Sequence, residues 1–203
     1  MNNRTVFIVV AIGLALFLLA FGFFFLGGGA PNAVVEIDTN MGKIKVQLFG
    51  DQAPVTVNNF LKYVEAKHYD GTIFHRVLAN FMIQGGGLDE NMTPRLREDK
   101  STRGIRNESS NGVKNERGTI AMARTGEPDS ATDQFFINVV DNRFLDRDKA
   151  EDGVGYCVFG KVIGGMKVVD EIRRVEVVKR PQDREAAFPI EPVIINSIRR
   201  VDQ

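Results

Sequence analysis

The sequence predicts a mainly β domain, built as a closed β-barrel with two α-helices and preceded by one apolar N-terminal helix. Short alternating apolar runs recur from residue 34 to the end of the chain. Only two segments in that region repeat apolar residues at helical spacing, and one long apolar run lies near the start. Many short strands with few helices favour a closed barrel over an α/β sheet.

The composition is that of a packed globular protein without strong charge. The chain has 203 residues, 43% of them hydrophobic, which suits one domain and a short appendage. Its 26 basic and 26 acidic side chains cancel, so no nucleic-acid partner is expected. Cys157 is the only cysteine, which excludes an internal disulfide framework and a multi-cysteine zinc site. His68 and His75 have no further ligands at metal-site spacing, so neither a metal nor another cofactor is expected.

Residues 6–26 carry no charged, amide or hydroxyl side chain. As a helix this run would be about 30 Å long, the thickness of the hydrocarbon core of a bilayer. A helix of a soluble core normally keeps a polar stripe, so the run predicts a transmembrane helix or signal-anchor. A cleavable signal peptide has a shorter apolar region, and an uncleaved anchor is therefore favoured, with cleavage as the alternative.

The charges around this run predict its orientation. Arg4 and the terminal amine precede it, and no charge follows until Glu36. The positive-inside rule then makes residues 1–5 a short cytoplasmic N-terminus and puts the domain on the extracytoplasmic, periplasmic side of the membrane. Residues 27–33 read as a flexible tether and residues 34–203 as the folded domain. Cleavage would leave the domain secreted or periplasmic.

The folded domain is predicted to begin with a β-hairpin followed by a helix. Apolar residues alternate with polar ones over 35–37 and 44–48, on either side of Asn40-Met41-Gly42. Asp51 and Pro54 suit the N-terminus of the helix that follows. Its buried face is predicted from four apolar residues at helical spacing: Val57, Phe60, Leu61 and Val64.

The remaining elements are short strands and one further helix. Five β runs are predicted over residues 72–77, 81–85, 119–123, 134–140 and 157–162. A second amphipathic helix is predicted from residue 166 to about 174, and a last strand over 193–201. The stretch 89–118 holds seven basic and six acidic side chains, which predicts a mixed solvated loop that forms a rim or lid.

Two of these strands present unusual side chains. In the run 134–140 the apolar residues 135, 137 and 139 share one face, so Phe136 lies on the polar face beside amides. It is either covered by a loop or part of a binding surface, and this strand alone leaves both open. Arg76 interrupts the apolar run 72–77, either as an ion-pair partner or as a hydrogen-bond donor in a groove. Taken alone, the first is the simpler interpretation.

Several segments together resemble the cyclophilins in order and spacing over residues 34–201. They are Phe74-His75-Arg76-Val77, Phe81-Met82-Ile83-Gln84-Gly85-Gly86, Ala121-Met122-Ala123, Ser130-Ala131, Gln134-Phe135-Phe136-Ile137, Phe144-Leu145-Asp146 and Val158-Phe159-Gly160. The resemblance implies an eight-stranded antiparallel barrel capped by two helices, with the site on its outer surface. It also implies peptidyl-prolyl cis/trans isomerase activity.

The resemblance carries site residues over to this chain. It implies that Arg76 is the catalytic donor and that Gln84 and Phe81 belong to the catalytic set. The substrate-binding residues that it implies are Met82, Ala123, Arg124, Thr125, Gln134, Phe136, Phe144, Leu145 and Tyr156. Arg124 and Thr125 stand where many eukaryotic members have Asn and Ala, while Phe144 and Tyr156 replace Trp and His. Such substitutions resemble bacterial members of the family.

The expected partners are proline-containing polypeptides and unfolded client proteins, together with the membrane through the N-terminal helix. The chain is expected to act as a monomer that assists folding outside the cytoplasm. The alternative is a non-catalytic module that holds proline segments, or a chaperone part of an envelope complex. Arg76 and Gln84 occurring together favour the enzyme, because capture of proline alone needs aromatic side chains more than a guanidinium.

Overall fold

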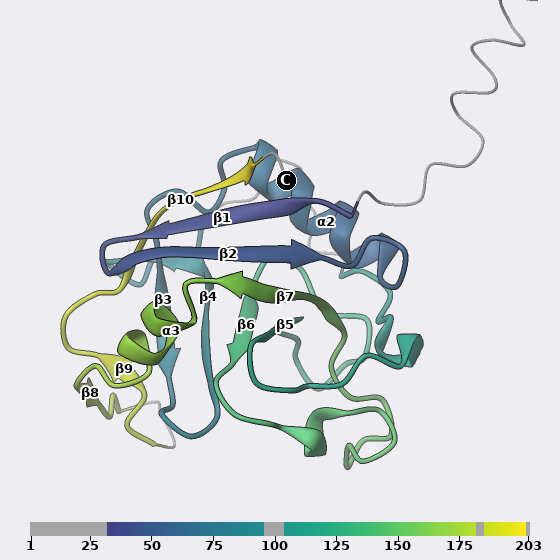
Figure 1. Cartoon of the computed structure of the whole chain (residues 1–203). Helices are drawn as coiled ribbons and strands as arrows, with labels where there is room; N and C mark the ends of the chain where they lie inside the picture. Colours follow the sequence, from purple (N-terminus) through teal and green to yellow (C-terminus); the bar gives the residue numbers. More distant parts are fainter. Residues whose placement is uncertain (1–31, 96–103, 182–184, 202–203) are drawn as a thin grey trace, which may run out of the picture.

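Eight antiparallel strands close into a barrel in the neighbour order β1-β10-β3-β4-β6-β5-β7-β2 (Figure 1). The computed structural model describes residues 32–95, 104–181 and 185–201. The strands are β1 (Val34–Thr39), β2 (Gly42–Leu48), β3 (Thr72–Val77), β4 (Met82–Asp89), β5 (Thr119–Met122), β6 (Phe135–Asn138), β7 (Val158–Gly164) and β10 (Ile194–Val201). The predicted closed, eight-stranded antiparallel barrel is confirmed.

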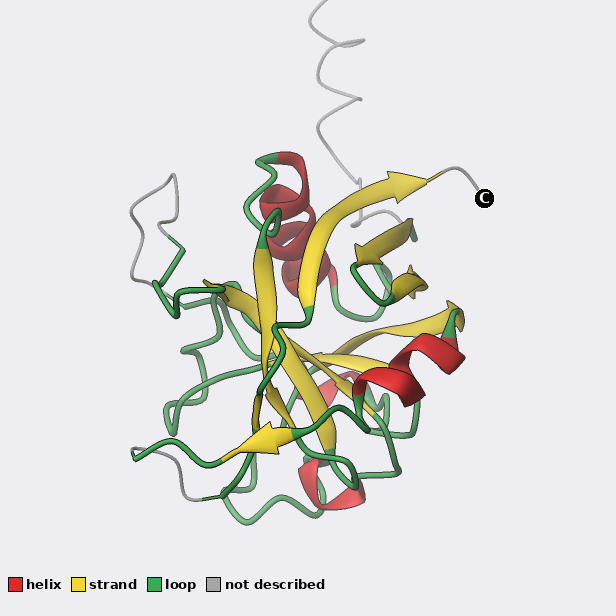
Figure 2. Cartoon of the chain, turned by 90° about the vertical axis from the view of Figure 1, so that its left-hand side faces the viewer, coloured by secondary structure: helices red, strands yellow, loops and turns green. Residues whose placement is uncertain are grey.

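Two α-helices pack against the barrel at separate places (Figure 2). Helix α2 (Pro54–Glu65) contacts β10, and α3 (Met166–Ile172) contacts β2. Helix α2 buries all four apolar residues that its periodicity predicted, Phe60 among them. Helix α3 buries Val169 and Ile172 and leaves Val168 half-buried. Two short 3₁₀ helices, η1 (Ser109–Asn111) and η2 (Arg143–Leu145), lie in the loops between strands.

The interior of the barrel is filled by alternate strand residues and by aromatic rings from α2 and the strands. On β2 the apolar residues 44, 46 and 48 are fully buried, whereas the polar residues between them are exposed. The ring of Phe60 lies 5.2 Å from Tyr69, 5.7 Å from Phe135 and 5.2 Å from Phe159, measured between ring centroids. These contacts fix α2 against the strands and leave the outer face of the barrel for function.

Strand β4 runs further than predicted, from Met82 to Asp89 and not only to residue 85. The glycines in this part of the strand allow close packing. Gly86 has φ +92°, and a Cβ there would lie 2.9 Å from ring atoms of both Phe135 and Tyr69. A two-stranded sheet of β8 (Val177–Val178) and β9 (Phe188–Pro189) was not predicted at all, because strands this short carry no periodic signal.

The N-terminus of α2 is not capped by the residue that the sequence suggested. Asp51 accepts a hydrogen bond from Asn32 Nδ2 at 2.5 Å and makes no capping bond to the helix. Glu108 does so instead, because its carboxylate accepts the backbone N–H groups of Val55 (3.1 Å) and Thr56 (2.8 Å). The capping residue lies more than fifty positions along the chain, beyond the reach of local sequence patterns.

The second half of the long polar stretch is packed and not solvated. Over residues 104–118, Glu108, Ser109 and Asn115 are buried. The N–H of Ile105 donates to the carbonyl of Ala131 at 2.9 Å, which joins the segment to the barrel. The expectation of a solvated loop was therefore wrong here, since partners elsewhere in the chain satisfy these polar groups.

The predicted transmembrane helix at 6–26 lies outside the described residues, as do residues 1–5 and the tether up to residue 31. Within the described ranges no helix is both long and apolar enough to cross a membrane.

Candidate active site

A row of side chains crosses four neighbouring strands on the outer face of the barrel. The pairing register sets Arg76 of β3 opposite Gln84 of β4, Gln84 opposite Phe136 of β6, and Phe136 opposite Ala121 of β5. Residues paired across strands point to the same face of a sheet, so these four side chains lie side by side.

A β-bulge decides that Arg76 joins this row. Simple alternation would turn Phe74 and Arg76 to the same face. The register shifts between them, because Phe74 pairs with Gly85 and Arg76 with Gln84, so two steps along β3 match one step along β4. Phe74 therefore belongs to the core and Arg76 to the outer row.

The row borders a recess of about 310 Å³ on the outer surface of the barrel. Its lining residues are Arg76, Phe81, Met82, Gln84, Ala123, Arg124, Phe136, Phe144, Leu145 and Tyr156. These are ten of the twelve residues that the resemblance implied, and they come from six separate segments of the chain. Thr125 and Gln134 lie beside the recess without lining it.

The floor of the recess is apolar and its rim is aromatic. Met82, Phe136 and Leu145 are buried in an outer apolar cluster that is separate from the barrel core. On the rim, Phe144 is 58% exposed and stacks on Phe81 with the ring centroids 5.5 Å apart. A small apolar ring could enter between these aromatic groups and lose its contact with water.

Arg76 supplies a cation at the open edge of the recess. Its side chain is 39% exposed, and its Cζ lies 5.7 Å from the ring centroid of Phe81. Nη2 donates to Oε1 of Glu185 at 3.4 Å, a long contact in an exposed ion pair. The guanidinium is therefore held near the recess while it retains donors for a ligand.

Gln134 contacts Gln84 from outside the recess. Gln84 Nε2 donates to Gln134 Oε1 at 2.9 Å, and the backbone carbonyl of Gln134 accepts the N–H of Ala123 at 3.0 Å. A Cβ on Gly87 would lie 2.5 Å from the side chain of Gln134, so only glycine leaves room for the amide there. Gln134 thus fixes the position of Gln84 at the recess.

The side chain of Arg124 is bonded to nearby protein groups. It is 3% exposed, donates to the carbonyls of Gly155 and Thr125 at 3.0 Å each, and forms an ion pair with Asp152. Its Cζ lies 4.4 Å from the ring centroid of Tyr156. The N–H groups of Gly155 and Val154, with Arg124, lower the pKa of Asp152 to about 2.

Arg124 therefore anchors the loop that carries Tyr156, and its side-chain donors are already occupied by protein groups. Thr125 lies in the next turn, where its hydroxyl donates to Ser130 Oγ at 2.9 Å.

A buried amide network behind the recess was missed by the sequence reasoning. Asn142 Nδ2 donates to the carbonyl of Phe81 and to Asn138 Oδ1, both at 2.7 Å. Asn138 Nδ2 donates in turn to Asn115 Oδ1 at 3.2 Å, and the backbone N–H of Asn115 donates to Asp146 Oδ1 at 2.7 Å. The four side chains are buried and tie the segments that carry Phe81, Phe144 and Leu145 together.

The groups that could do covalent or metal chemistry are engaged elsewhere. Cys157 is buried, and burial raises the pKa of its thiol to about 11, so it does not supply a thiolate at neutral pH. His68 Nε2 lies 2.9 Å from Asp133 Oδ2, away from the recess. Among the described residues no three His, Cys, Asp or Glu side chains cluster as metal ligands do. The recess offers an apolar surface and one cation, Arg76, that is not fully bonded to protein groups, and these suit a conformational change in a bound ligand.

A closed barrel with such a recess on its outer face is the scaffold of a protein suited to bind an apolar ring next to a hydrogen-bond donor. The family described as cyclophilin type peptidyl-prolyl cis-trans isomerase/CLD matches residues 34–200. A peptidyl-prolyl cis-trans isomerase of Acinetobacter baylyi is 54% identical over 71% of this chain and 73% of its own length. Peptidyl-prolyl cis-trans isomerase B of Escherichia coli is 48% identical over 81% of this chain and 98% of its own.

The solved structures agree with these sequence relatives. The crystal structure of a cyclophilin type peptidyl-prolyl cis-trans isomerase of Cryptosporidium parvum has a TM-score of 0.66 and 28% identity, and covers 84% of this chain and 98% of its own. This chain belongs to the cyclophilin-type peptidyl-prolyl cis-trans isomerase family. It is an isomerase that acts on proline-containing peptides.

Proposed function

We propose that this isomerase accelerates rotation about X–Pro bonds in extracytoplasmic proteins, with Arg76 as its catalytic donor, and so assists their folding. The observation that carries the catalytic part is the guanidinium of Arg76 at the edge of the apolar recess, in register with Gln84 and Phe136. A proline ring would enter the recess, and the X–Pro amide would lie against Arg76.

The chemistry needs a donor at one atom. C–N resonance imposes a barrier of about 18–20 kcal/mol on rotation of a peptide bond. In the twisted transition state this resonance is lost, and the prolyl nitrogen becomes a pyramidal amine with a free lone pair. A guanidinium that donates to this nitrogen stabilises the twisted state more than either planar state, which lowers the barrier without a nucleophile or a metal.

The other residues hold the substrate while one side of the bond rotates. Phe81, Met82 and Phe136 grip the ring through apolar contact in the recess. Gln84, fixed by Gln134, donates to the carbonyl next to the proline. The rim residue Phe144 covers the open side of the ring. Each tenfold acceleration requires about 1.4 kcal/mol, so a few such contacts suffice.

Replacement of Arg76 tests the catalytic assignment. We expect Arg76→Ala to lower kcat/KM for a proline-containing peptide about a hundredfold, the effect of removing one transition-state donor. Arg200→Ala is the matched control, because Arg200 is an arginine of β10 that lies outside the recess and 3.7 Å from the carboxylate of Glu65. Circular dichroism and the melting temperature check that both variants fold. Near wild-type turnover in folded Arg76→Ala would contradict the role of Arg76.

The extracytoplasmic placement is supported by the apolar run at 6–26 and by Arg4 before it. The expected result is that the protein fractionates with membranes and becomes accessible to protease once the outer envelope is opened. Intact mass of the membrane-bound form would then distinguish an uncleaved anchor from a processed chain. Recovery in the cytoplasmic fraction would contradict the placement while leaving the isomerase assignment intact.

We also expect unfolded, proline-bearing chains as clients and a monomeric enzyme. A refolding protein whose slow phase is an X–Pro isomerisation is the suitable substrate, because that phase lasts tens to hundreds of seconds. Addition of the enzyme should shorten the slow phase, and sedimentation of the detergent-solubilised chain should give the mass of one copy. An unchanged slow phase would contradict the folding role.

A further inference from the structure

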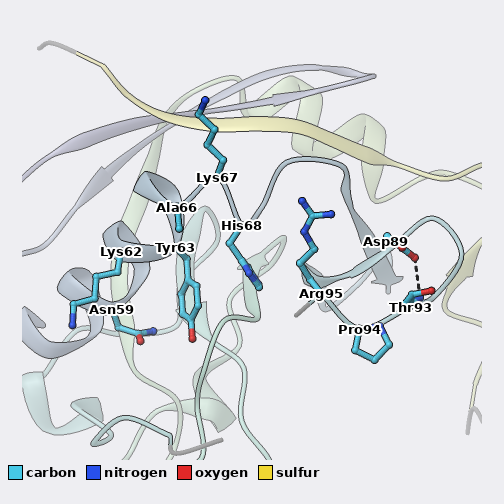
Figure 3. Close-up of a pocket in the computed structure, with 10 residues that line it drawn as sticks. All are labelled: Asn59, Lys62, Tyr63, Ala66, Lys67, His68, Asp89, Thr93, Pro94 and Arg95. Atoms are coloured by element: carbon cyan, nitrogen blue, oxygen red, sulfur yellow. Dashed lines mark hydrogen bonds between the residues drawn. The ribbon is translucent and has the colours of Figure 1, made fainter. Parts of the chain in front are cut away.

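A second recess, about 590 Å³ in volume and larger than the first, lies between the C-terminal end of α2 and the turn that follows β4 (Figure 3). Helix α2 and the residues after it supply one wall, and residues 89 and 93–95 supply the other. The lining residues are Asn59, Lys62, Tyr63, Ala66, Lys67, His68, Asp89, Thr93, Pro94 and Arg95. None of them belongs to the recess of Arg76.

Three cations line this recess without a side-chain partner among the described residues: Lys62, Lys67 and Arg95. The acids near α2 are already occupied by arginines of β10. Arg199 forms two hydrogen bonds with Asp70, at 2.6 and 2.8 Å, and Arg200 lies 3.7 Å from Glu65. The local pairing therefore leaves an excess of positive charge at the recess.

The ordinary explanation for a lysine here is compensation of the helix dipole, and Lys62 does lie in the last turn of α2. That explanation does not cover Arg95, which comes from the opposite wall. The backbone N–H of Arg95 donates to the carbonyl of Gly87 at 2.9 Å, so β4 holds this residue in place. Figure 3 shows its guanidinium extending between the two walls.

The recess also offers hydrogen-bond acceptors and apolar surface. Asp89 Oδ1 accepts the N–H groups of Asn91 and Thr93 at 2.9 and 2.8 Å, whereas its Oδ2 has no partner among the described residues. Asn59 Nδ2 donates to the carbonyl of Thr132 at 2.6 Å, which leaves its oxygen as an acceptor. The recess therefore has cations that can pair with carboxylates and acceptors that can take hydrogen bonds from N–H groups. It also has apolar surface from Ala66 and Pro94. This combination suits a polypeptide better than a bare phosphate or a lipid headgroup.

Direct contacts connect the second recess with the first. Gly87, whose carbonyl holds Arg95, lies against Gln134, and Gln134 accepts the hydrogen bond from Gln84 of the first recess. The wall residue His68 is paired with Asp133, the neighbour of Gln134 in the chain. A polypeptide bound in the recess of Arg76 can therefore continue over Gln134 toward Arg95.

We propose that the second recess binds an acidic segment of a polypeptide, and that it captures a client at a place separate from its proline. Carboxylates of the segment pair with Lys62, Lys67 and Arg95, and its backbone N–H groups donate to Asp89 and Asn59. The binding of an acidic segment is argued from the residues of this recess alone. Only the statement that the segment belongs to a client chain rests on the proposed function.

A peptide without proline tests the site independently of catalysis. The probe is a fluorescein-labelled peptide of alternating Glu and Gly, titrated with the detergent-solubilised full chain at low salt and followed by fluorescence anisotropy. We expect the double substitution Lys67→Gln with Arg95→Gln to raise the Kd at least about tenfold, a change of about 1.4 kcal/mol. Lys161→Gln is the control for charge, because Lys161 is an exposed lysine of β7 outside both recesses.

Four outcomes would overturn the proposal. The first is an unchanged Kd in the folded double variant, and the second is weakening by Lys161→Gln to the same extent. The third is displacement of the peptide by inorganic phosphate at equal molar concentration, which would define a general anion site. Loss of peptide binding in Arg76→Ala would place the peptide in the first recess and would likewise contradict a separate site. None of these outcomes depends on whether the enzyme turns over proline peptides.

Discussion

At the scale of single residues, the environment of Arg76 sets how its charge is presented. The guanidinium lies beside the ring of Phe81 and pairs with Glu185, a residue of the segment that leads to β9. The pair is exposed on both sides, 39% for Arg76 and 56% for Glu185, so it contributes little to stability. We expect the pair to influence ligand binding instead. The carboxylate of Glu185 lies at the edge of the recess, where it would repel an acidic substrate and compete with it for the guanidinium.

Glu185→Gln should therefore change substrate preference and not stability. We expect kcat/KM for a peptide with Glu next to the X–Pro pair to rise about two- to fivefold relative to a neutral peptide, the size of a screened charge interaction at an exposed site. The ratio should return toward the wild-type value at high salt, where the Debye length is only about 3 Å. Parallel assays of both peptides at low and high salt measure it. An unchanged ratio at low salt would show that Glu185 does not influence the recess.

His75 is the residue at the bulge of β3, and it is buried. Its Nδ1 has no hydrogen-bond partner among the described residues. Burial, with Arg180 and Arg76 nearby, lowers the pKa of His75 to about 4. The folded state therefore holds the imidazole neutral near pH 7.

A lowered histidine pKa makes folding weaker in mild acid. The unfolded chain takes up this proton below about pH 6.5, whereas the folded chain does so only below about pH 4, so stability falls as the pH drops through this window. Between pH 7 and pH 5 the wild type should lose about 2 kcal/mol more unfolding free energy than His75→Gln. Urea titrations at the two pH values measure the difference. Equal losses in both proteins would contradict the assignment to His75.

At the scale of elements, β6 and the loop after it support the recess from behind. Phe136 faces the recess from β6, and Asn138 on the same face enters the buried amide network. Asn142 follows in the loop and holds the carbonyl of Phe81. The network connects the end of β6 to the segment before β4, so hydrogen bonds as well as strand pairing hold Phe81 at the recess.

Asn142→Ala should affect both stability and catalysis. The substitution leaves the buried Asn138 Oδ1 without its donor from Asn142, which costs about 1–3 kcal/mol. Loss of the bond to Phe81 should also lower kcat at a temperature where the variant is fully folded. Asn40→Ala is the matched control, because Asn40 also makes two hydrogen bonds, to Pro192 and Ile194, at a hairpin outside the recess. If both variants lost equal stability and neither lost activity, the network would have only a structural role.

At the scale of the whole molecule, closure of the barrel determines which strands become neighbours. β3 and β4 adjoin in sequence, whereas β4 reaches its next neighbour β6 only past β5 and two long loops. The recess needs β3, β4, β6 and β5 together, and it therefore exists only when these four strands have paired. The site therefore depends on pairing between strands that are distant in the sequence.

The sequence predicted the local features of this architecture well. Alternation predicted the buried faces of β2 and β6 and the outward position of Phe136, because the side-chain period of a strand is a local property. Motif order predicted the family, and ten of the residues that it implied surround one recess. The sequence did not predict the end of β4, because it depends on the packing of Gly86 against Phe135 and Tyr69. It did not predict the cap of α2, because Glu108 reaches the helix from a distant loop.

The sequence by itself thus determined the class of fold, the apolar run at 6–26 and the residue types that line the recess of Arg76. Tertiary structure alone decided that a bulge turns Arg76 outward, that buried amides support Phe81, and that Arg95 faces the end of α2 across a second recess. The physical reason is the sequence distance over which each kind of interaction acts. Periodicity and turn chemistry act between residues a few positions apart, whereas these three features depend on contacts between segments that only the closed barrel brings together.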